Sequence, residues 1–406
     1  MTQEINKKAL FYASCLALIT TGASFSIRAG ILPELGASFN LTAEQLGFIN
    51  SMWFLGFPIS MVLGGLFYYK VGAKNIMRIA FVAHALGIVM TIYAQGYSSL
   101  LISTLFIGFG NGCTEAACNP LIAEMYSGNK MAKMLNRFHM WFPGGIVIGS
   151  LVSKFMTDMN LNWQLQMWFI MIPTIIYAIL FYKKKFPQPI DNAAVSLSTN
   201  LQAMYKPTFI FLFCCMALTA ISEFGPNQWV GIILSSSGAS PMLVLALVTG
   251  VMAIGRFFAG GVIKKFSITG VLLLSAIFAT IGIYLFSIVT GPAVYFAAIL
   301  YALGVCYFWP TMISATAQKS PLSGALGLSI IGGVGMFSTS IFQPIIGSWI
   351  DNSRNSIIQT AGQVENLDLL VGQSTMTKIA IFPAILIVLF SFFFVWQKRL
   401  DKRENI

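Results

Sequence analysis

The chain has 406 residues, of which 57% are hydrophobic and only 9% are charged, and its mean hydropathy is +0.78. A soluble globular domain contains roughly a quarter charged residues, so this composition excludes a water-soluble fold and a disordered chain. The 24 Lys and Arg exceed the 13 Asp and Glu, but the basic residues lie in short clusters between long apolar runs. That pattern is typical of membrane topology, so we expect an integral membrane protein that does not bind nucleic acid.

The chain contains about twelve apolar runs, each near the length of roughly 20 residues that a transmembrane helix needs. None of them alternates apolar and polar residues as the strands of a membrane barrel do. We therefore expect an all-α membrane protein with about twelve transmembrane helices. In chain order the predicted spans are 9–34, 44–68, 76–95, 98–124, 136–158, 164–183, 207–235, 240–263, 268–290, 292–317, 322–348 and 376–397.

A polar stretch at residues 184–206 divides the predicted spans into two groups of six. Gly65-(x3)-Tyr69-Lys70 recurs about 190 residues later as Gly260-(x3)-Lys264-Lys265, and Asn119-Pro120 has a counterpart in Trp309-Pro310. Two six-helix halves in one chain are a frequent plan of secondary transporters. We expect an N-terminal half at 1–183, a cytoplasmic linker at 184–206 and a C-terminal half at 207–406.

The basic clusters lie in the even-numbered connections and near both termini. By the positive-inside rule both termini are expected in the cytoplasm, with the protein in a plasma membrane, a bacterial inner membrane in particular. The six Cys lie inside apolar runs and are interpreted as packing residues. With two His, no metal-ligand spacing, no P-loop and no nucleophile–base set, we expect neither a cofactor nor a metal, and no enzymatic activity.

The candidate functional residues are polar side chains inside the predicted spans, where a charge costs about 2.5–3.5 kcal/mol on insertion scales. Arg28 lies near the outer end of the first span, and three roles stay open for it: a substrate ligand, a partner of Glu115 or Glu223, or a residue whose head group reaches the membrane surface. Glu115 lies in the middle of span 4 with Asn119 on the same helix face. This carboxylate could accept sugar hydroxyls and carry a coupling proton, or it could bond to a neighbouring helix.

His139 in span 5 is a candidate for proton relay or sugar binding, and a packing role is equally open. In span 7, Gly225 and Pro226 are expected to interrupt the helix, close to polar residues suited to a neutral polyhydroxylated ligand: Glu223, Asn227, Gln228 and Trp229. Trp309 in span 10 could stack on a sugar ring. Arg256 and His84 are interpreted as structural, and Gly108, Gly110 and Gly112 as a surface for close helix packing.

With these motifs the chain resembles the major facilitator superfamily, through Gly65-(x3)-Tyr69-Lys70-Val71-Gly72-Ala73-Lys74 between spans 2 and 3. Within it the chain is similar to the fucose–proton symporter family, on the run Gly112-Cys113-Thr114-Glu115-Ala116-Ala117-Cys118-Asn119-Pro120 and on Ile254-Gly255-Arg256-Phe257. The resemblance implies that the glutamate of the first run, Glu115, serves substrate binding and proton coupling. It also implies that spans 1, 4, 7 and 10 line the transport cavity.

The leading hypothesis is an importer of a hexose-like sugar that works by ion-coupled symport and alternating access. Glu115 and Glu223 are the predicted proton-coupling residues. The substrate is a small sugar and the coupling ion is a proton or sodium. Two alternatives stay open: a proton-driven exporter of small amphiphilic compounds, and a membrane sensor or scaffold that transports nothing.

Overall fold

The computed structural model describes residues 5–126, 128–187, 197–362 and 364–404, and within these ranges the chain is helical without a strand. It forms two compact units, one made of residues 1–193 and 343–348, the other of residues 194–342 and 349–406. Of the predicted linker, residues 188–196 lie outside the described residues and residues 197–204 form a short helix. The predicted domain boundaries stay a prediction.

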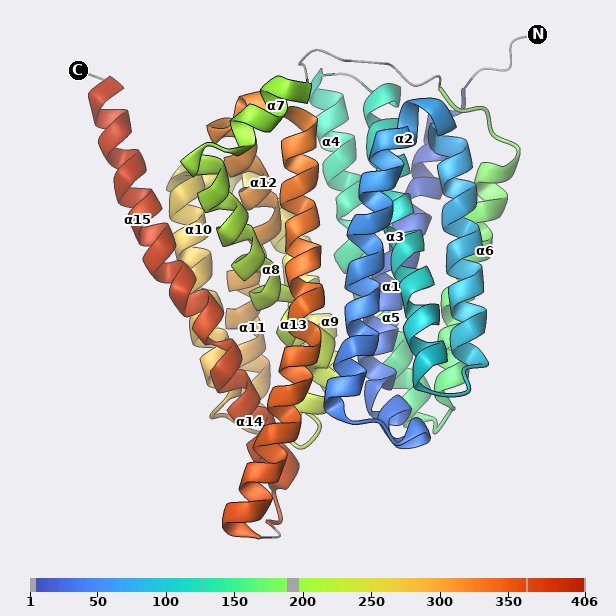
Figure 1. Ribbon diagram of the computed structural model, residues 1–406, viewed down its shortest axis with the longest axis vertical. Coiled ribbons are helices and arrows are strands. Elements are labelled where there is room, and N and C mark those ends of the chain that lie inside the picture. Colours follow the sequence, from blue (N-terminus) through green and yellow to red (C-terminus); the bar gives the residue numbers. More distant parts are fainter. Residues whose placement is uncertain (1–4, 127, 188–196, 363, 405–406) are drawn as a thin grey trace. The chain divides into compact units, whose positions relative to one another are not determined.

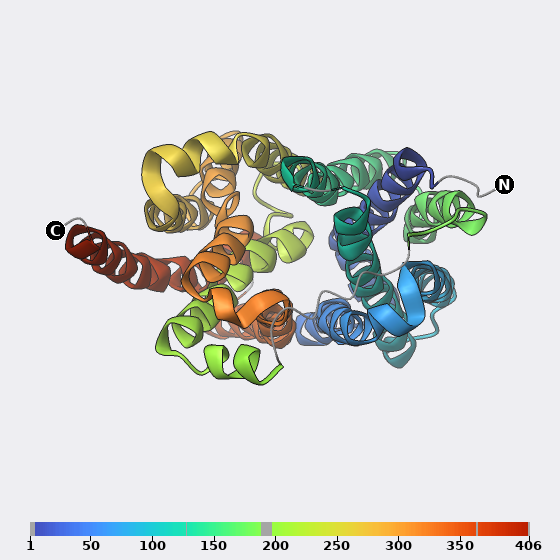
Figure 2. The ribbon, with the colours of Figure 1, turned by 90° about the horizontal axis from the view of Figure 1, so that it is seen from above.

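The first unit is a bundle of helices that run alongside one another (Figures 1 and 2). In it α2 packs along α3, and α1 packs against both α5 and α6. Its helices are α1 (Lys7–Phe39), α2 (Ala43–Ile92), α3 (Tyr97–Met125), α4 (Gly128–His139), α5 (Trp141–Asp158) and α6 (Trp163–Tyr182).

The second unit is a bundle of the same kind, in which α10 packs against α11 and α15, and α8 against α12 and α14. Its helices are α7 (Leu197–Met204), α8 (Pro207–Ile233), α9 (Pro241–Phe257), α10 (Ala259–Phe286), α11 (Ala293–Val305), α12 (Phe308–Lys319), the 3₁₀ turn η1 (Pro321–Ser323), α13 (Gly324–Ala361), α14 (Leu367–Ile379) and α15 (Ile381–Glu404).

The described helices confirm an all-α membrane fold and account for all twelve predicted spans. Ten stretches of helix are long and apolar enough to cross a membrane. The other two predicted spans, 136–158 and 240–263, also fall on helices, but these are broken, the first between α4 and α5 and the second between α9 and α10. Conversely α2 contains two predicted spans, 44–68 and 76–95, because the chain turns sharply at Gly72 (φ +75°) between two helical stretches. A similar turn at Ser267 (φ +61°) in α10 separates the end of the predicted span 240–263 from the span 268–290.

Three of the helix breaks lie four residues before a proline. α4 ends at His139, α11 ends one residue before Cys306, and α14 ends at Ile379, which precede Pro143, Pro310 and Pro383 by four positions. A proline has no N–H to donate to the carbonyl four residues earlier, and its ring presses against that carbonyl. A proline thus accompanies each of these three breaks, although prolines inside other helices, such as Pro33 in α1 and Pro120 in α3, do not end them.

Helices α13 and α14 extend beyond the spans predicted for them, as a paired projection at one end of the second unit (Figure 1). The predicted span 322–348 stopped at the polar residues that follow it, yet α13 continues to Ala361. Arg354 of α13 pairs with Asp368 of α14 at 2.5 Å, and Lys378 donates to Ser353 Oγ at 2.9 Å. Beyond the predicted apolar span, polar contacts therefore hold the two helices together.

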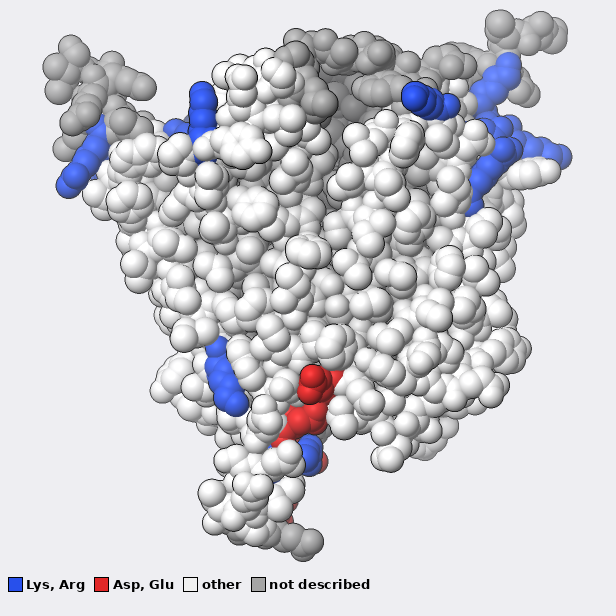
Figure 3. All heavy atoms as spheres, in the orientation of Figure 1, with Lys and Arg blue, Asp and Glu red and all other residues white. Residues whose placement is uncertain are grey.

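On the face shown in Figure 3, a belt without charged side chains crosses the middle of each unit. Lys and Arg lie towards the helix ends, and the acidic side chains in view lie near the α13–α14 projection. Uncharged side chains over the length of roughly 20 residues are what the hydrocarbon core of a bilayer requires. The chain is a multi-pass membrane protein.

Candidate functional site

Three predicted residues meet in the first unit around the carboxylate of Glu115. Asn119, one turn further along α3, donates from Nδ2 to Glu115 Oε2 at 2.7 Å. The imidazole Nδ1 of His139 lies 3.9 Å from the other oxygen, Oε1. The side chain of Glu115 is 13% exposed and that of His139 47% exposed, so the carboxylate is sheltered and the imidazole is open. We call Glu115, Asn119 and His139 the acidic triad.

The position of the His139 imidazole depends on where helix α4 ends. His139 is the last residue of α4, which ends there because Pro143 removes the hydrogen bond to the His139 carbonyl. Carboxylate, amide and imidazole together provide both donors and acceptors for hydroxyl groups. Two of the three groups can also take up or release a proton.

Close packing between α3, which carries Glu115, and α2 depends on glycines of α3, as predicted for Gly108 and Gly112. A Cβ on Gly112 would lie 2.1 Å from the Phe57 carbonyl oxygen, and one on Gly108 would lie 2.2 Å from the Trp53 carbonyl oxygen. Both contacts are with the backbone of α2, which cannot move aside cheaply. Glycine at these positions therefore lets α2 and α3 touch along their backbones.

Replacing Gly112 with alanine should destabilise the protein by about 1–3 kcal/mol, since an added methyl group must push two packed backbones apart. The matched control is Gly65→Ala on α2, where nothing lies within 4 Å of the added Cβ. Thermal unfolding in detergent measures both. Equal melting temperatures for the two variants would contradict the close packing of α2 and α3.

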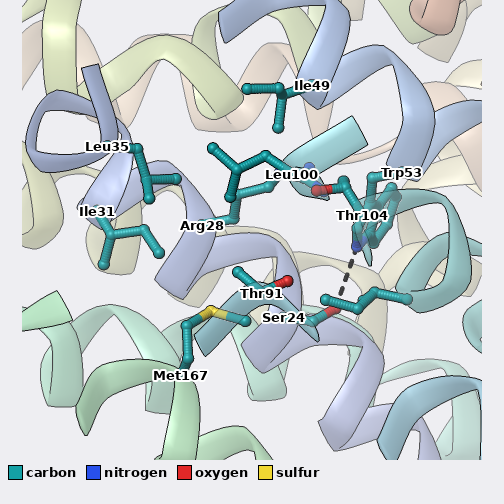
Figure 4. Close-up of a pocket in the computed structure, with 11 residues that line it drawn as sticks. Ser24, Arg28, Ile31, Leu35, Ile49, Trp53, Thr91, Leu100, Thr104 and Met167 are labelled. Atoms are coloured by element: carbon teal, nitrogen blue, oxygen red, sulfur yellow. Dashed lines mark hydrogen bonds between the residues drawn. The ribbon is translucent and has the colours of Figure 1, made fainter. Parts of the chain in front are cut away.

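Arg28 lines a small cavity inside the first unit (Figure 4). Its guanidinium carbon lies 5.1 Å from the centre of the Trp53 ring and 5.9 Å from that of Phe54, within the range of cation–π attraction. The same cavity is lined by Ser24, one turn earlier on α1, and by polar side chains of two other helices, Thr91 of α2 and Thr104 of α3. Arg28 is only 6% exposed, so its side chain is enclosed by the helices of the first unit, which favours a role inside the protein over one at the membrane surface.

Polar contacts continue from this cavity across the unit. Trp53 Nε1 donates to Ser24 Oγ at 3.1 Å, and Asn111 Nδ2 approaches the same oxygen at 3.4 Å. His84 then joins Asn111 Oδ1 to the Tyr177 hydroxyl, with both distances at 2.9 Å. This agrees with the structural interpretation of His84. Sequence reasoning passed over Asn111 and Tyr177, whose signal was a single polar group within an apolar run.

The second unit has its own buried acid, Glu223 on α8, which is 2% exposed. The prediction that Gly225 and Pro226 interrupt this helix is wrong, because α8 runs unbroken from Pro207 to Ile233. The carbonyl that Pro226 frees belongs to Ser222, and it accepts a hydrogen bond of 3.0 Å from the Tyr301 hydroxyl. The hydroxyl has a single proton, which it shares with the Glu223 carbonyl at 2.7 Å. Tyr301 of α11 thus replaces the missing backbone donor, and the helix continues.

Arg256 of α9 forms an ion pair with this acid. Its Nη2 lies 3.2 Å from Glu223 Oε1, and its Nε donates to the Cys306 carbonyl at 3.0 Å. The Cys306 carbonyl is the one freed by Pro310, four residues on. Oε2 of Glu223 has no hydrogen-bond partner among the described residues. The structural interpretation of Arg256 is therefore supported by two contacts, to a freed carbonyl and to a buried charge.

The remaining predicted residues of the second unit do not share one surface. Asn227 lies one turn after Glu223 and so on the same face of α8, and it is buried like Gln228. The Trp229 ring is fully buried and its Nε1 has no partner among the described residues. Trp309 of α12 is partly exposed and packs edge-on against Phe224, with ring centres 5.9 Å apart. Which of these groups contacts a substrate stays a prediction.

Replacing Tyr301 with phenylalanine should lower the free energy of unfolding by about 1–3 kcal/mol, because the Ser222 carbonyl then loses its donor in a buried place. Tyr284→Phe on α10, where the ring is 53% exposed, is the matched control and should change stability by less than about 0.5 kcal/mol. Chemical unfolding in mixed micelles compares them. A Tyr301→Phe variant as stable as the control would show that Pro226 needs no compensating donor.

The comparisons with known proteins identify the family. The sequence profile described as the Major Facilitator Superfamily matches residues 14–342. The chain belongs to the major facilitator superfamily. The resemblance noted in the motif between spans 2 and 3 is thereby confirmed, and family and fold are those of transporters rather than enzymes. Transporters of the superfamily bind small-molecule substrates. The narrower similarity to fucose–proton symporters stays a prediction.

Individual members of the superfamily match at low identity. The hexuronate transporter of Bacillus subtilis is 28% identical over 200 residues, which are 48% of this chain and 47% of that transporter; the match thus spans about half of the relative's length. The cis,cis-muconate transport protein of Acinetobacter baylyi is 23% identical over 363 residues, covering 84% and 87%. The crystal structure of a D-xylose–proton symporter superposes with a TM-score of 0.75 at 15% identity, covering 93% of this chain and 97% of the symporter, which shows the same fold.

Proposed function

We propose that this member of the major facilitator superfamily imports a hexose-like sugar together with a coupled ion, by alternating access of its two halves. The proposal places it in a bacterial inner membrane. Both termini are proposed to lie in the cytoplasm, because the clusters of Lys and Arg favour that side of the membrane. The acidic triad carries the proposal. A carboxylate inside a membrane span is costly, and the carboxylate of Glu115 is oriented by a hydrogen bond of 2.7 Å from the Asn119 amide.

The triad suits both parts of the proposed cycle. Glu115 Oε1 and the exposed imidazole of His139 provide an acceptor and a donor for sugar hydroxyls. When Glu115 takes up a proton it becomes neutral, which lowers the cost of moving the loaded site through an apolar environment. The coupling ion in this scheme is a proton. The D-xylose–proton symporter, similar in fold, combines a sugar and a proton according to its name.

A sugar acid is the second candidate substrate, and Arg28 is the observation that favours it. The guanidinium lies in a cavity with the hydroxyls of Ser24, Thr91 and Thr104, and guanidinium groups match carboxylates. Hexuronate and muconate, the cargoes named for two relatives, both carry carboxylates. In this candidate Arg28 binds the carboxylate and the acidic triad binds hydroxyls.

Counterflow into liposomes that contain the full-length protein tests the proposal. The vesicles are loaded with an excess of unlabelled hexose or hexuronate, and the entry of the same labelled compound is followed. Transient accumulation of a neutral hexose supports the leading proposal, and accumulation of hexuronate alone supports the second candidate. Exchange of hydrophobic cations but of neither sugar would overturn both and favour an exporter of amphiphilic compounds.

A further inference from the structure

Two helix breaks in the second unit face each other and are bonded together. One lies between α9 and α10 at Phe258, the other between α11 and α12 at Cys306 and Tyr307. The Tyr307 hydroxyl donates to the Gly255 carbonyl at 3.1 Å, and the Cys306 thiol lies 3.5 Å from the Met252 carbonyl oxygen. Arg256 adds the third bond, from Nε to the Cys306 carbonyl. We call the two breaks, joined through Met252, Gly255, Arg256, Cys306 and Tyr307, the paired break.

The two helices pack closely at the paired break. A Cβ on Gly255 would lie 2.6 Å from the Cys306 sulfur. Breaks in helices are places where backbone angles can change at little cost, and hinges use them. Three hydrogen bonds join the two breaks here. A change of angle at α9–α10 alone would have to break them.

Arg256 joins this paired break to the charge on Glu223. One side chain provides both contacts, Nε to the Cys306 carbonyl and Nη2 to Glu223 Oε1 at 3.2 Å. Only a guanidinium offers several donors in a rigid planar arrangement that can serve two acceptors at once. A proton that bonds to the unpartnered Oε2 of Glu223 converts the carboxylate to a neutral acid. The charge attraction that holds Nη2 is then lost.

The other titratable groups near Glu223 do not replace that attraction. From the helices packed against α8, Tyr301 of α11 donates to backbone carbonyls, and Cys306 and Tyr307 bond to α9. The charged groups of α14 are engaged at its ends, with Asp368 paired to Arg354 and Lys378 bonded to Ser353. Within the described part of the second unit, Arg256 is the charged group bonded to the Glu223 carboxylate.

We propose that Arg256 is a positioning residue. While Glu223 is charged, Arg256 holds the two helix breaks of the paired break together, and when Glu223 is neutral this restraint is lost. The α9–α10 and α11–α12 breaks then bend together as one hinge during transport. The proposal rests on the proposed function in one respect only, namely that Glu223 changes its charge during the transport cycle.

The thiol of Cys306 lies at the hinge and reports on it directly. It is buried in the structure, as is Cys215 on α8, whereas Cys214 is exposed. Purified full-length protein is treated with N-ethylmaleimide, and the alkylation of each native cysteine is followed by mass spectrometry. In Glu223→Gln, which imitates the neutral acid, we expect Cys306 to react at least about five times faster than in the parent protein, with Cys215 unchanged.

Two further variants separate the hinge from general loosening. Tyr301→Phe loosens the packing of α8, including the backbone at Glu223, but keeps the charge that holds Arg256, so Cys306 should react more slowly than in Glu223→Gln. Glu223→Asp keeps the charge but shortens the side chain by one methylene, so an intermediate rate is expected, and it serves if Glu223→Gln cannot be purified. A Cys306 rate within twofold of the parent in both Glu223 variants, or an equal increase in Tyr301→Phe, would overturn the proposal.

No substrate is needed for this experiment, so its failure and a failure of the proposed function are distinguishable. If no sugar is transported but Cys306 reacts as expected, the hinge holds and the cargo is wrong. If sugar is transported in a proton-coupled manner and Cys306 stays protected in the Glu223 variants, the hinge alone is wrong.

Discussion

Replacing Glu115 with glutamine should abolish uphill sugar accumulation, with a reduction of at least about tenfold, and should leave counterflow of the same sugar within about threefold of the parent. Glutamine keeps the size of the side chain, one acceptor oxygen and a donor, so hydroxyl contacts and the bond with Asn119 can persist. It cannot take up or release a proton. Binding and exchange therefore survive while coupling to a pH gradient is lost.

Accumulation in liposomes with an imposed pH gradient, acidic outside, measures the first quantity, and counterflow without a gradient measures the second. Glu124→Gln is the matched control on the same helix, because this glutamate accepts a bond of 3.0 Å from Tyr68 instead of belonging to the acidic triad. It should accumulate sugar like the parent. Equal uphill transport by Glu115→Gln and the parent would remove the coupling role from Glu115.

Replacing Arg256 with glutamine should lower the free energy of unfolding by about 3–5 kcal/mol, the loss typical when one partner of a buried ion pair is removed. Its partner Glu223 is 2% exposed and would be left as an uncompensated buried charge. The double variant Arg256→Gln with Glu223→Gln should recover most of that loss, since two neutral amides replace two charges. The recovery identifies the pair as the cause rather than the lost contact with Cys306.

A surface pair in the same unit provides the control for that cycle. Arg354 pairs with Asp368, and their side chains are 39% and 53% exposed, so Arg354→Gln should cost no more than about 1 kcal/mol. Unfolding of Arg256→Gln, Glu223→Gln, the double variant and Arg354→Gln in mixed micelles completes the comparison. If Arg256→Gln costs no more than Arg354→Gln, or if the double variant is less stable than both single variants, the buried pair does not stabilise the second unit.

Much of the fold follows from the sequence, because length and hydropathy decide which segments can lie in a bilayer. All twelve predicted spans are helical, and the apolar runs carried enough information for that. The helix that continues to Ala361 was not predicted, because its last turns are polar and are stabilised by α14, a partner that hydropathy does not show. The break expected at Pro226 was predicted wrongly for a similar reason, since the compensating donor Tyr301 comes from 75 residues further along the chain.

The candidate site divides in the same manner. Glu115 and Asn119 are four residues apart on one helix, so their contact could be predicted from spacing alone. The approach of His139 depends on where α4 ends, and the pairing of Glu223 with Arg256 depends on how α8 packs against α9. These are tertiary facts that spacing cannot supply. The sequence singles out charged residues within predicted spans, such as Glu115, Glu223 and Arg256, while the partners that contact them emerge from the packing.

Sugar-driven proton entry tests the central claim most directly. Full-length protein is reconstituted into liposomes that contain a pH-sensitive dye, and a hexose is added outside. We predict acidification of the lumen that depends on the sugar and is absent in Glu115→Gln vesicles, while Glu124→Gln vesicles respond like the parent. A sugar that enters without any change in lumenal pH, or an acidification that persists in Glu115→Gln, would contradict proton-coupled import through the acidic triad.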